Sequence, residues 1–269
     1  MTASPVVRAV PRGLLVLGLL LPFVPLLVWA GSGQWRFPAV VPQEVSSRGV
    51  ALLFDPASEV LQGLATSLVL GVTVSTIACC IGLAAGRALG LYSFRGKRLV
   101  QFLLLAPAIV PGLTVTLGIS VFFLRYGLTG TLPGVVLVQL VPTIPYVTLV
   151  LGSAFANFEL GYEDQARTLG AGPLRTFWHV TLPVVRPALV VAAFFAFLIS
   201  WSEYILTLLI GGGTIKTLPL LLFAYIGGSD LNLAAALAVL FVLPPFLLVA
   251  LTSRFLTGGS TAAVGLGKL

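Results

Sequence analysis

The sequence predicts an all-α membrane protein with six transmembrane helices, and three observations lead to that fold class. Of the 269 residues, 58% are hydrophobic and only 9% are charged, whereas soluble domains carry about 25% charged residues. Several apolar runs are long enough to cross a hydrocarbon core of about 30 Å. The runs are continuous, whereas a β-barrel would alternate in segments of about ten residues. Because backbone groups in lipid must be paired within their own segment, each run is predicted to be a helix.

The predicted spans follow one another along the chain with connections of very different length between them. The first run follows a short basic head, a pattern that also describes a signal peptide, but its length favours a retained helix. Pro22 and Pro25 predict a kink in it. A polar, turn-rich stretch at 34–62 follows the first span, and a loop at 211–230 that opens with three glycines follows the fifth. The six spans are residues 13–33, 63–86, 99–123, 133–156, 188–210 and 231–255.

The basic residues are distributed unevenly between the two sides of the predicted bundle. Six spans put both termini on one side, and that side holds 11 of the 15 Lys and Arg residues. Positive residues gather in cytoplasmic loops, so the termini, the 87–98 loop and the 158–187 segment are predicted to be cytoplasmic. The same placement argues against nucleic-acid binding despite a net charge of +7. The only cysteines, Cys79 and Cys80, are adjacent in an apolar run and indicate neither a disulfide scaffold nor a metal site.

The 158–187 segment, Phe158 to Pro187, is the part of the chain least suited to hydrocarbon, because it holds seven ionisable residues. Its first half predicts a short helix with acidic residues near its start, where they suit the positive helix end. The run from Gly170 to Pro173 then predicts a stop. A second short segment with an apolar side follows, and Pro183 and Pro187 are expected to end it before the fifth span. The prediction is a helix, a turn and a helix on the cytoplasmic face.

This segment resembles the EAA loop of type I ABC importer permeases. The matching residues are Asp164 to Ala171, DQARTLGA, followed by Thr181-Leu182-Pro183. The match departs from the family pattern at two positions, because Asp164 stands where the family has Glu and Gln165 where it has Ala. Similar features extend over about residues 60–255, including the runs Leu105–Pro111 and Ser200–Tyr204. The resemblance implies an N-terminal helix and extracytoplasmic loop at 1–60, a permease core at 61–255 and a cytoplasmic tail at 256–269.

The resemblance also implies a mechanism and a set of partners. The loop would form a coupling helix that docks on a cytoplasmic ABC ATPase dimer, whose closing switches the cavity between inward- and outward-facing states. A second permease subunit, identical or different, and an extracytoplasmic solute-binding protein would complete the complex in a bacterial inner membrane. The chain would need no cofactor and would not be an enzyme, because ATP would be bound by the partner. The implied coupling residues are Glu163, Asp164, Gln165, Ala166, Gly170, Ala171, Leu182 and Pro183.

The residues alone support the same division of labour. A P-loop requires GxxxxGK[ST], and the nearest run, Gly90 to Lys97, has five residues between its glycines. The energy source is therefore expected on another chain. A stand-alone secondary transporter or channel is the alternative, although such proteins often show inverted repeats or several intramembrane ion-binding groups. An intramembrane enzyme would need at least two catalytic groups at membrane depth, and only Glu203 qualifies among the ionisable residues.

Glu203 is the one acidic residue well inside a predicted span. A carboxylate there costs about 2.5–3.5 kcal/mol on insertion scales and marks either a solute pathway or a structural pair. Relatives often carry an acid here whatever their substrate, which favours the structural role. Ser202, Tyr204 and Thr207 could line the same face, whereas Gln139 and Asn157 are expected to form interhelical hydrogen bonds.

The substrate is left open by the sequence. The Trp201–Tyr204 run resembles sugar permeases, whereas the glycine-rich loop leading to Thr217–Leu220 resembles the polyamine, thiamine and iron class, which we favour.

Overall fold

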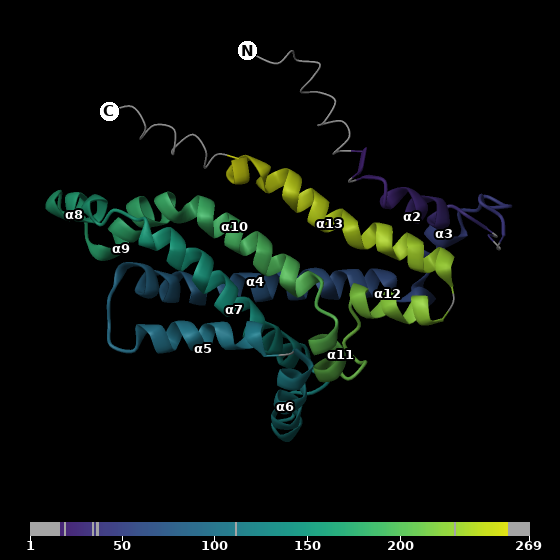
Figure 1. Ribbon diagram of the computed structural model, residues 1–269, viewed down its shortest axis with the longest axis horizontal. Helices are drawn as coiled ribbons and strands as arrows, with labels where there is room; N and C mark the ends of the chain where they lie inside the picture. The colour runs from purple at the N-terminus through teal and green to yellow at the C-terminus, as the bar shows by residue number, and fades with distance from the viewer. Residues whose placement is uncertain are drawn as a thin grey trace, which may run out of the picture. The chain divides into compact units, whose positions relative to one another are not determined.

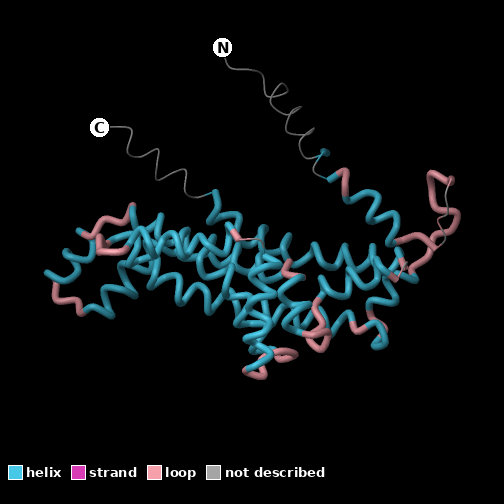
Figure 2. The backbone as a smooth tube through the Cα atoms, turned by 60° about the horizontal axis from the view of Figure 1, so that its bottom comes forward, coloured by secondary structure: helices cyan, strands magenta, loops and turns pink. Residues whose placement is uncertain are grey.

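The computed structural model describes residues 17–18, 20–33, 35, 38–110, 112–228 and 230–257, and these residues are mostly helical (Figure 1 and Figure 2). The only β-pairing in these ranges is an isolated antiparallel bridge between Ser32 and Val45. The predicted all-α class is therefore confirmed for the described part of the chain. Residues 13–16 and 19 of the predicted first span and most of the predicted tail lie outside it.

The chain divides into two compact units, which are described one at a time. The first unit contains Met1–Leu64 and Leu218–Pro244, and the second contains Ala65–Thr217 and Pro245–Leu269. Both divisions cut through long helices, so the units are clusters of contacts and not separate stretches of chain. The predicted boundaries at residues 60 and 255 remain predictions.

The first unit combines short helices with the first parts of the long helices α4 and α13. Arg48 pairs with Asp230 at 3.0 Å, and the Asn232 side-chain amide donates to the backbone carbonyls of Trp29 and Ser32. These bonds tie the start of the last long helix to the N-terminal region. The elements are α2 (Phe23–Ala30), α3 (Arg48–Leu53), the 3-10 turn η1 (Pro56–Ser58), the start of α4 (Val60–Leu91), α12 (Leu218–Gly227) and α13 (Leu231–Thr257) up to Pro244.

The structure of this unit can be compared with two predictions, the kink in the first span and the loop at 211–230. The kink predicted at the first prolines corresponds to a turn at residues 21–22, after which α2 begins. The 211–230 stretch, predicted to be a loop, instead contains α12, a ten-residue helix. The run LPLLLFAYIG is apolar and contains good helix formers, so proline at its second position starts the helix instead of breaking it.

Long helices dominate the second unit, and α7 packs along α10 with α4 beside them (Figure 1). Small and branched apolar side chains form the core that these three helices share, with Ala192 and Ala196 allowing close approach. The elements are most of α4, then α5 (Lys97–Ile109), α6 (Gly112–Arg125), α7 (Leu132–Ala156), α8 (Gly161–Thr168), α9 (Pro173–Thr176), the π-helical turn η2 (Phe177–Thr181), α10 (Leu182–Trp201) and α11 (Ile205–Gly211).

Glycines spaced four residues apart let α4 lie directly against α7. A β-carbon at Gly82, Gly86 or Gly90 would come within 2.6, 2.8 or 2.5 Å of atoms of α7. Because residues four apart share one face of a helix, these glycines form a single smooth strip. Small residues of this kind let helix backbones approach closely in membranes. The strip sets the spacing of the two helices and thus the position of the end of α4.

Among the described residues, four helical runs are long and apolar enough to cross a membrane: Val60–Leu91, Leu132–Ala156, Pro173–Trp201 and Leu231–Ser253. They correspond to the predicted spans at 63–86, 133–156, 188–210 and 231–255. The first of them extends past its predicted end, so Arg87 lies within α4 and not in the predicted 87–98 loop.

The predicted span at 99–123 is not one continuous helix, because it separates into α5 and α6. The break follows Val110, whose φ of −78° and ψ of 134° are extended. Val110 precedes Pro111, and a residue before proline is sterically disfavoured from the α region. The apolar pattern alone could not reveal this break, because the residues on both sides of it are apolar.

The predicted span at 188–210 is wrong at both ends. Its helix is continuous with the 158–187 segment, since α9, η2 and α10 form one run from Pro173 to Trp201. The prediction that Pro183 and Pro187 end a helix is therefore wrong. Pro183 has no N–H to offer an α-helical bond, and the preceding wide π-turn takes up the change in spacing.

At its far end, the run stops after Trp201. Ser202 donates its hydroxyl to the Leu198 carbonyl at 2.8 Å, a local bond that competes with the helix. A new helix, α11, starts at Ile205.

Candidate functional site

The 158–187 segment contains the helix and turn that the sequence predicted. The α8 helix carries Glu163 and Asp164 in its first turn and Arg167 in its last, an order that suits the helix dipole. Gly170 follows in a left-handed conformation with φ of +84°. Its N–H donates to the Arg167 carbonyl, and the Ala171 N–H donates to the Ala166 carbonyl. This pair of bonds is a Schellman stop, so glycine is needed here for its backbone and not for space.

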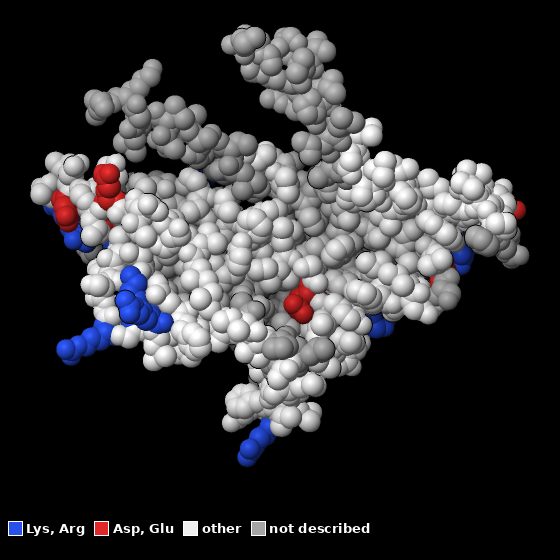
Figure 3. Space-filling model, in the orientation of Figure 1, with Lys and Arg blue, Asp and Glu red and all other residues white. Residues whose placement is uncertain are grey.

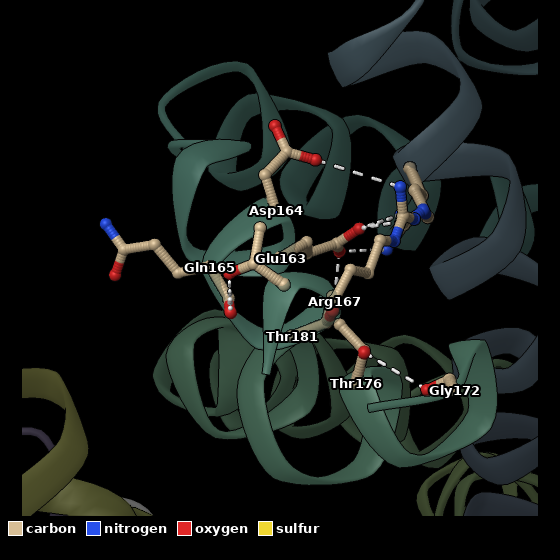
Figure 4. Close-up of polar contacts among 9 residues, drawn as sticks. Glu163, Asp164, Gln165, Arg167, Gly172, Thr176 and Thr181 are labelled. Carbon is tan, nitrogen blue, oxygen red and sulfur yellow. Dashed lines mark hydrogen bonds and ion pairs between the residues drawn. The ribbon is translucent and has the colours of Figure 1, made fainter. Parts of the chain in front are cut away.

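Glu163 is the only buried residue of α8, all of which is described, and it faces the interior of the protein (Figure 4). Arg87 of α4 binds it with two parallel bonds, Nη1 to Oε1 at 2.7 Å and Nη2 to Oε2 at 2.8 Å. Thr181 of η2 donates its hydroxyl to Oε1 at 2.6 Å. Arg167 adds a longer contact at 3.5 Å. Three elements therefore meet at one carboxylate.

The charge state of Glu163 follows from these contacts. The paired bonds from Arg87 lower the pKa of the Glu163 carboxyl, and the Thr181 hydroxyl and the Arg167 charge act in the same direction. Burial opposes them by disfavouring the charged form, with an effect second in size to that of the Arg87 bonds. The carboxylate is thus held ionised although its side chain is buried.

The other predicted coupling residues on α8 and its turn lie away from this contact. Asp164, Gln165 and Gly170 are exposed, while Ala166 and Ala171 are half-buried. On the face shown in Figure 3, acidic and basic side chains gather at the end where α8 lies, whereas the flanks of the long helices there are largely uncharged. Of the last two predicted residues, Leu182 is half-buried and Pro183 is exposed.

Large apolar side chains are exposed next to these polar residues. Leu169 is 88% exposed, Leu174 72% and Trp178 57%. An open groove beside α9 is lined by Leu174, Trp178, Arg175 and His179. Exposed apolar groups rimmed by polar ones mark contact surfaces. We call Asp164, Gln165, Leu169, Gly170, Leu174 and Trp178 the docking face.

The residues predicted around Glu203 are not all brought to one place. Glu203 lies in the break between α10 and α11, where its Oε1 accepts the Leu206 N–H at 2.9 Å. It also lines a cavity of about 190 Å³ whose other walls are mostly apolar. Thr207 is fully buried and faces α7 instead, whereas Ser202 is exposed and bonds to its own helix. Tyr204 is half-buried.

Gln139 of α7 makes the interhelical bonds that the sequence predicted. Its amide donates to the Thr207 hydroxyl at 2.8 Å and accepts the Ser200 hydroxyl at 2.5 Å. These partners lie on opposite sides of the α10–α11 break. The corresponding prediction for Asn157 is wrong, because its side chain donates to the Ser153 carbonyl one turn earlier.

Arg87 is the residue that sequence reasoning missed. It was interpreted as a loop charge that sets membrane orientation. The available signal was the apolar pattern on either side of it, which continues the helix to Leu91. An arginine within a membrane helix calls for a partner, and that consideration would have led to the acidic residues of the 158–187 segment.

Comparison with known proteins identifies the family to which the chain belongs. Residues 78–257 match the family model for the binding-protein-dependent transport system inner membrane component. The molybdenum transport system permease protein ModB of Mycobacterium tuberculosis is 32% identical over 74% of this chain and 80% of its own length. The putrescine transport system permease protein PotI of Escherichia coli is 28% identical over 64% of this chain and 63% of its own.

A solved structure shares the fold. A chain of a bacterial ABC transporter involved in the import of the acidic polysaccharide alginate superposes with a TM-score of 0.69 at 19% identity, covering 94% of this chain and 96% of that one. The family match covers more than half of the sequence, and it favours an importer subunit over the alternative of a stand-alone transporter or channel. The chain therefore belongs to the family of binding-protein-dependent transport system inner membrane components, and it is a permease subunit of an ABC importer.

Proposed function

We propose that α8 is the coupling helix of this permease and that the docking face binds a separate cytoplasmic ABC ATPase, which binds and hydrolyses the ATP. The observation that carries the proposal is the split between the two sides of α8. One side is anchored through buried Glu163, and the other presents exposed Asp164, Gln165 and Leu169. A solvated loop would have no need of a buried anchor beneath a row of exposed large apolar side chains.

The remaining parts of the assembly follow from the same proposal. The permease spans a bacterial inner membrane six times with both termini in the cytoplasm, with α5 and α6 as one interrupted span and α2 as the described end of the first. The distribution of Lys and Arg supports this orientation. A second permease subunit and an ATPase dimer complete the membrane complex, and a solute-binding protein delivers the cargo, as the family description implies.

Variants of two glycines test the docking. Gly170 and Gly96 both have positive φ, +84° and +88°, and a β-carbon would meet open space at either. Gly170→Val and Gly96→Val therefore introduce the same backbone strain at different places. We expect Gly170→Val to insert in the membrane but lose copurification of the ATPase, whereas Gly96→Val retains it. Equal behaviour of the two variants, whether both bind or neither does, would contradict the proposal.

We infer a small solute of the polyamine, thiamine and iron class as cargo, on the basis of the 211–220 sequence. The similar permeases include one from a putrescine system and one from a molybdenum system, so molybdate is the second candidate. A thermal-shift comparison of the cognate binding protein with putrescine, thiamine, ferric iron and molybdate tests this. Stabilisation by molybdate alone would overturn the inferred class.

A further inference from the structure

The polar attachment of α8 to other elements depends on one side chain, Glu163. Every other residue of α8 is exposed or half-buried, whereas Glu163 is 2% exposed. Apart from the chain connections at its two ends, its polar links to other elements run through this carboxylate to Arg87 and Thr181. A force applied to α8 by a partner can therefore reach α4 through Glu163, in addition to the backbone and the packing of α8 against α9 and η2.

The geometry of the contact resists rotation as well as separation. Arg87 presents a planar fork, and both of its terminal nitrogens bond to different oxygens of Glu163. Paired bonds of this kind fix the relative orientation of the two groups, which a single lysine ammonium does not do. The Arg87 guanidinium also lies 6.0 Å from the centre of the Phe155 ring of α7. The pair is thus constrained by α4, α7 and η2 together.

A buried ion pair needs an explanation beyond stability. Removing charges from water is unfavourable, and well-packed apolar residues often hold a structure equally well. Apolar contact is not directional, however, whereas the paired bonds define one orientation. A joint with a single orientation is what a small movement at one site needs in order to become a movement of a packed helix.

We propose that the Arg87–Glu163–Thr181 contact is the joint that transmits displacement of the coupling helix α8 to the membrane helix α4. Glu163 and Arg87 act here as positioning residues and not as part of the docking face. The inference rests on the proposed function, because it requires an ATPase that moves α8. The predicted coupling residues then divide into an outer group that binds the ATPase and the inner carboxylate of Glu163, which transmits the movement of α8 to α4.

The chain contains a natural position for a reporter on α4. Cys80 is exposed and precedes Arg87 by seven residues, which places it about two helical turns away on the same side. In a Cys79→Ser background, Cys80 is the only thiol of the chain. A nitroxide attached there reports movement of α4 through its electron paramagnetic resonance line shape. The measurement requires no knowledge of the cargo.

The experiment compares the complex of permease and ATPase without nucleotide and after trapping with ATP and orthovanadate. We expect the nitroxide spectrum to shift on trapping in the otherwise unaltered permease and in Glu159→Gln, which neutralises an exposed acid of the same segment. In Glu163→Gln we expect the ATPase still to copurify but the shift to be lost. If Glu163→Gln does not accumulate, Arg87→Lys makes the same test, because it keeps both charges and removes the paired geometry.

The remaining outcomes would contradict the joint, the transmission to α4 or the proposed function. A retained shift in Glu163→Gln and Arg87→Lys overturns the joint while leaving the docking intact. Loss of ATPase from these variants also overturns it, because the pair would then belong to the docking face. An unaltered permease that binds the ATPase but shows no shift contradicts transmission to α4. An unaltered permease that binds no ATPase instead refutes the proposed function itself.

Discussion

Glu163 and Glu203 show two ways in which a mostly apolar helical protein holds a carboxylate. Glu163 is buried, and both of its oxygens are bound by side chains from other elements. Glu203 is half-buried in a helix break, where its Oε1 accepts a hydrogen bond from the Leu206 N–H three residues ahead. Its surroundings also include a cavity. The first carboxylate is fixed by distant partners, and the second is fixed locally and keeps an open side.

The difference separates two functions for acidic residues in this permease. A carboxylate bound on all sides can hold helices together but has little capacity left for a ligand. A carboxylate held through one oxygen beside a cavity could still receive a hydrogen-bond donor from a solute. Variants at and around the two carboxylates should reveal whether they differ in this way.

The largest effect is expected for Arg87→Met. It leaves Glu163 buried without its main partner, and breaking a buried pair in this way costs about 3–5 kcal/mol. Unfolding of the purified permease in detergent measures the change. Arg125→Met is the matched control, because Arg125 is an exposed arginine at the end of α6. Equal stability of the two variants would show that Glu163 is not held as described.

Gly90→Ala should produce the next largest effect. Its β-carbon would meet Phe155 at 2.5 Å and the Ala156 nitrogen at 2.9 Å, and overpacking of this kind costs about 1–3 kcal/mol. The change pushes α4 away from α7 and so disturbs the Glu163 contact but not the surroundings of Glu203. Gly118→Ala on α6 adds the same atom in open space and should leave the midpoint of unfolding unchanged or raise it slightly. A harmless Gly90→Ala would refute close contact of these helices.

Acid should weaken the Glu163 contact in a defined direction. Because Arg87 lowers the pKa of Glu163 from its ordinary value of 4.5, the pair contributes its full stability above that value. The contribution is lost as pH falls through the lower pKa of the folded state. The stability difference between the unaltered permease and Glu163→Gln should therefore be constant above about pH 5 and shrink below about pH 4.

Unfolding in detergent across this range measures that difference. In an Arg87→Met background this loss of stability at acidic pH should shrink or reverse, because the bonds that lower the pKa of Glu163 are gone while burial, which raises it, remains. A difference that stays constant down to the lowest pH would show that Arg87 does not hold the carboxylate ionised.

The smallest effect on stability is expected for Glu203→Gln. The amide oxygen can still accept the Leu206 N–H, so the stability should change by less than about 0.5 kcal/mol. Glu203→Leu removes that acceptor and should cost about 1 kcal/mol, as loss of a helix cap does. If the open oxygen contacts the solute, both variants should reduce uptake despite this difference in stability. A Glu203→Gln variant as unstable as Arg87→Met would show that Glu203, like Glu163, is essential for holding the helices together.

The sequence was most informative where structure depends on local pattern. The helix at Leu132–Ala156 was predicted to within a residue, because a long apolar run follows Thr131, whose hydroxyl accepts the Gly134 N–H. The stop at Gly170 was predicted for the same reason, since its left-handed backbone is a property of glycine itself.

The sequence was least informative where structure depends on distant partners. Arg87 lies 76 residues from Glu163 in sequence, and nothing near either residue indicates the other. The break at Ser202–Tyr204 was missed for a related reason. Its residues could continue a helix, and the alternative geometry is stabilised in part by Gln139 of α7, which binds on both sides of the break.

That single amide also bears on how relatives of this permease diversify. Its nitrogen donates to Thr207 and its oxygen accepts from Ser200. Replacing any one of these three residues therefore leaves a buried polar atom without a hydrogen-bond partner. Gradual drift at one position is therefore disfavoured. In an alignment of homologues, positions 139, 200 and 207 should change as a set, with apolar residues at all three wherever the amide is gone.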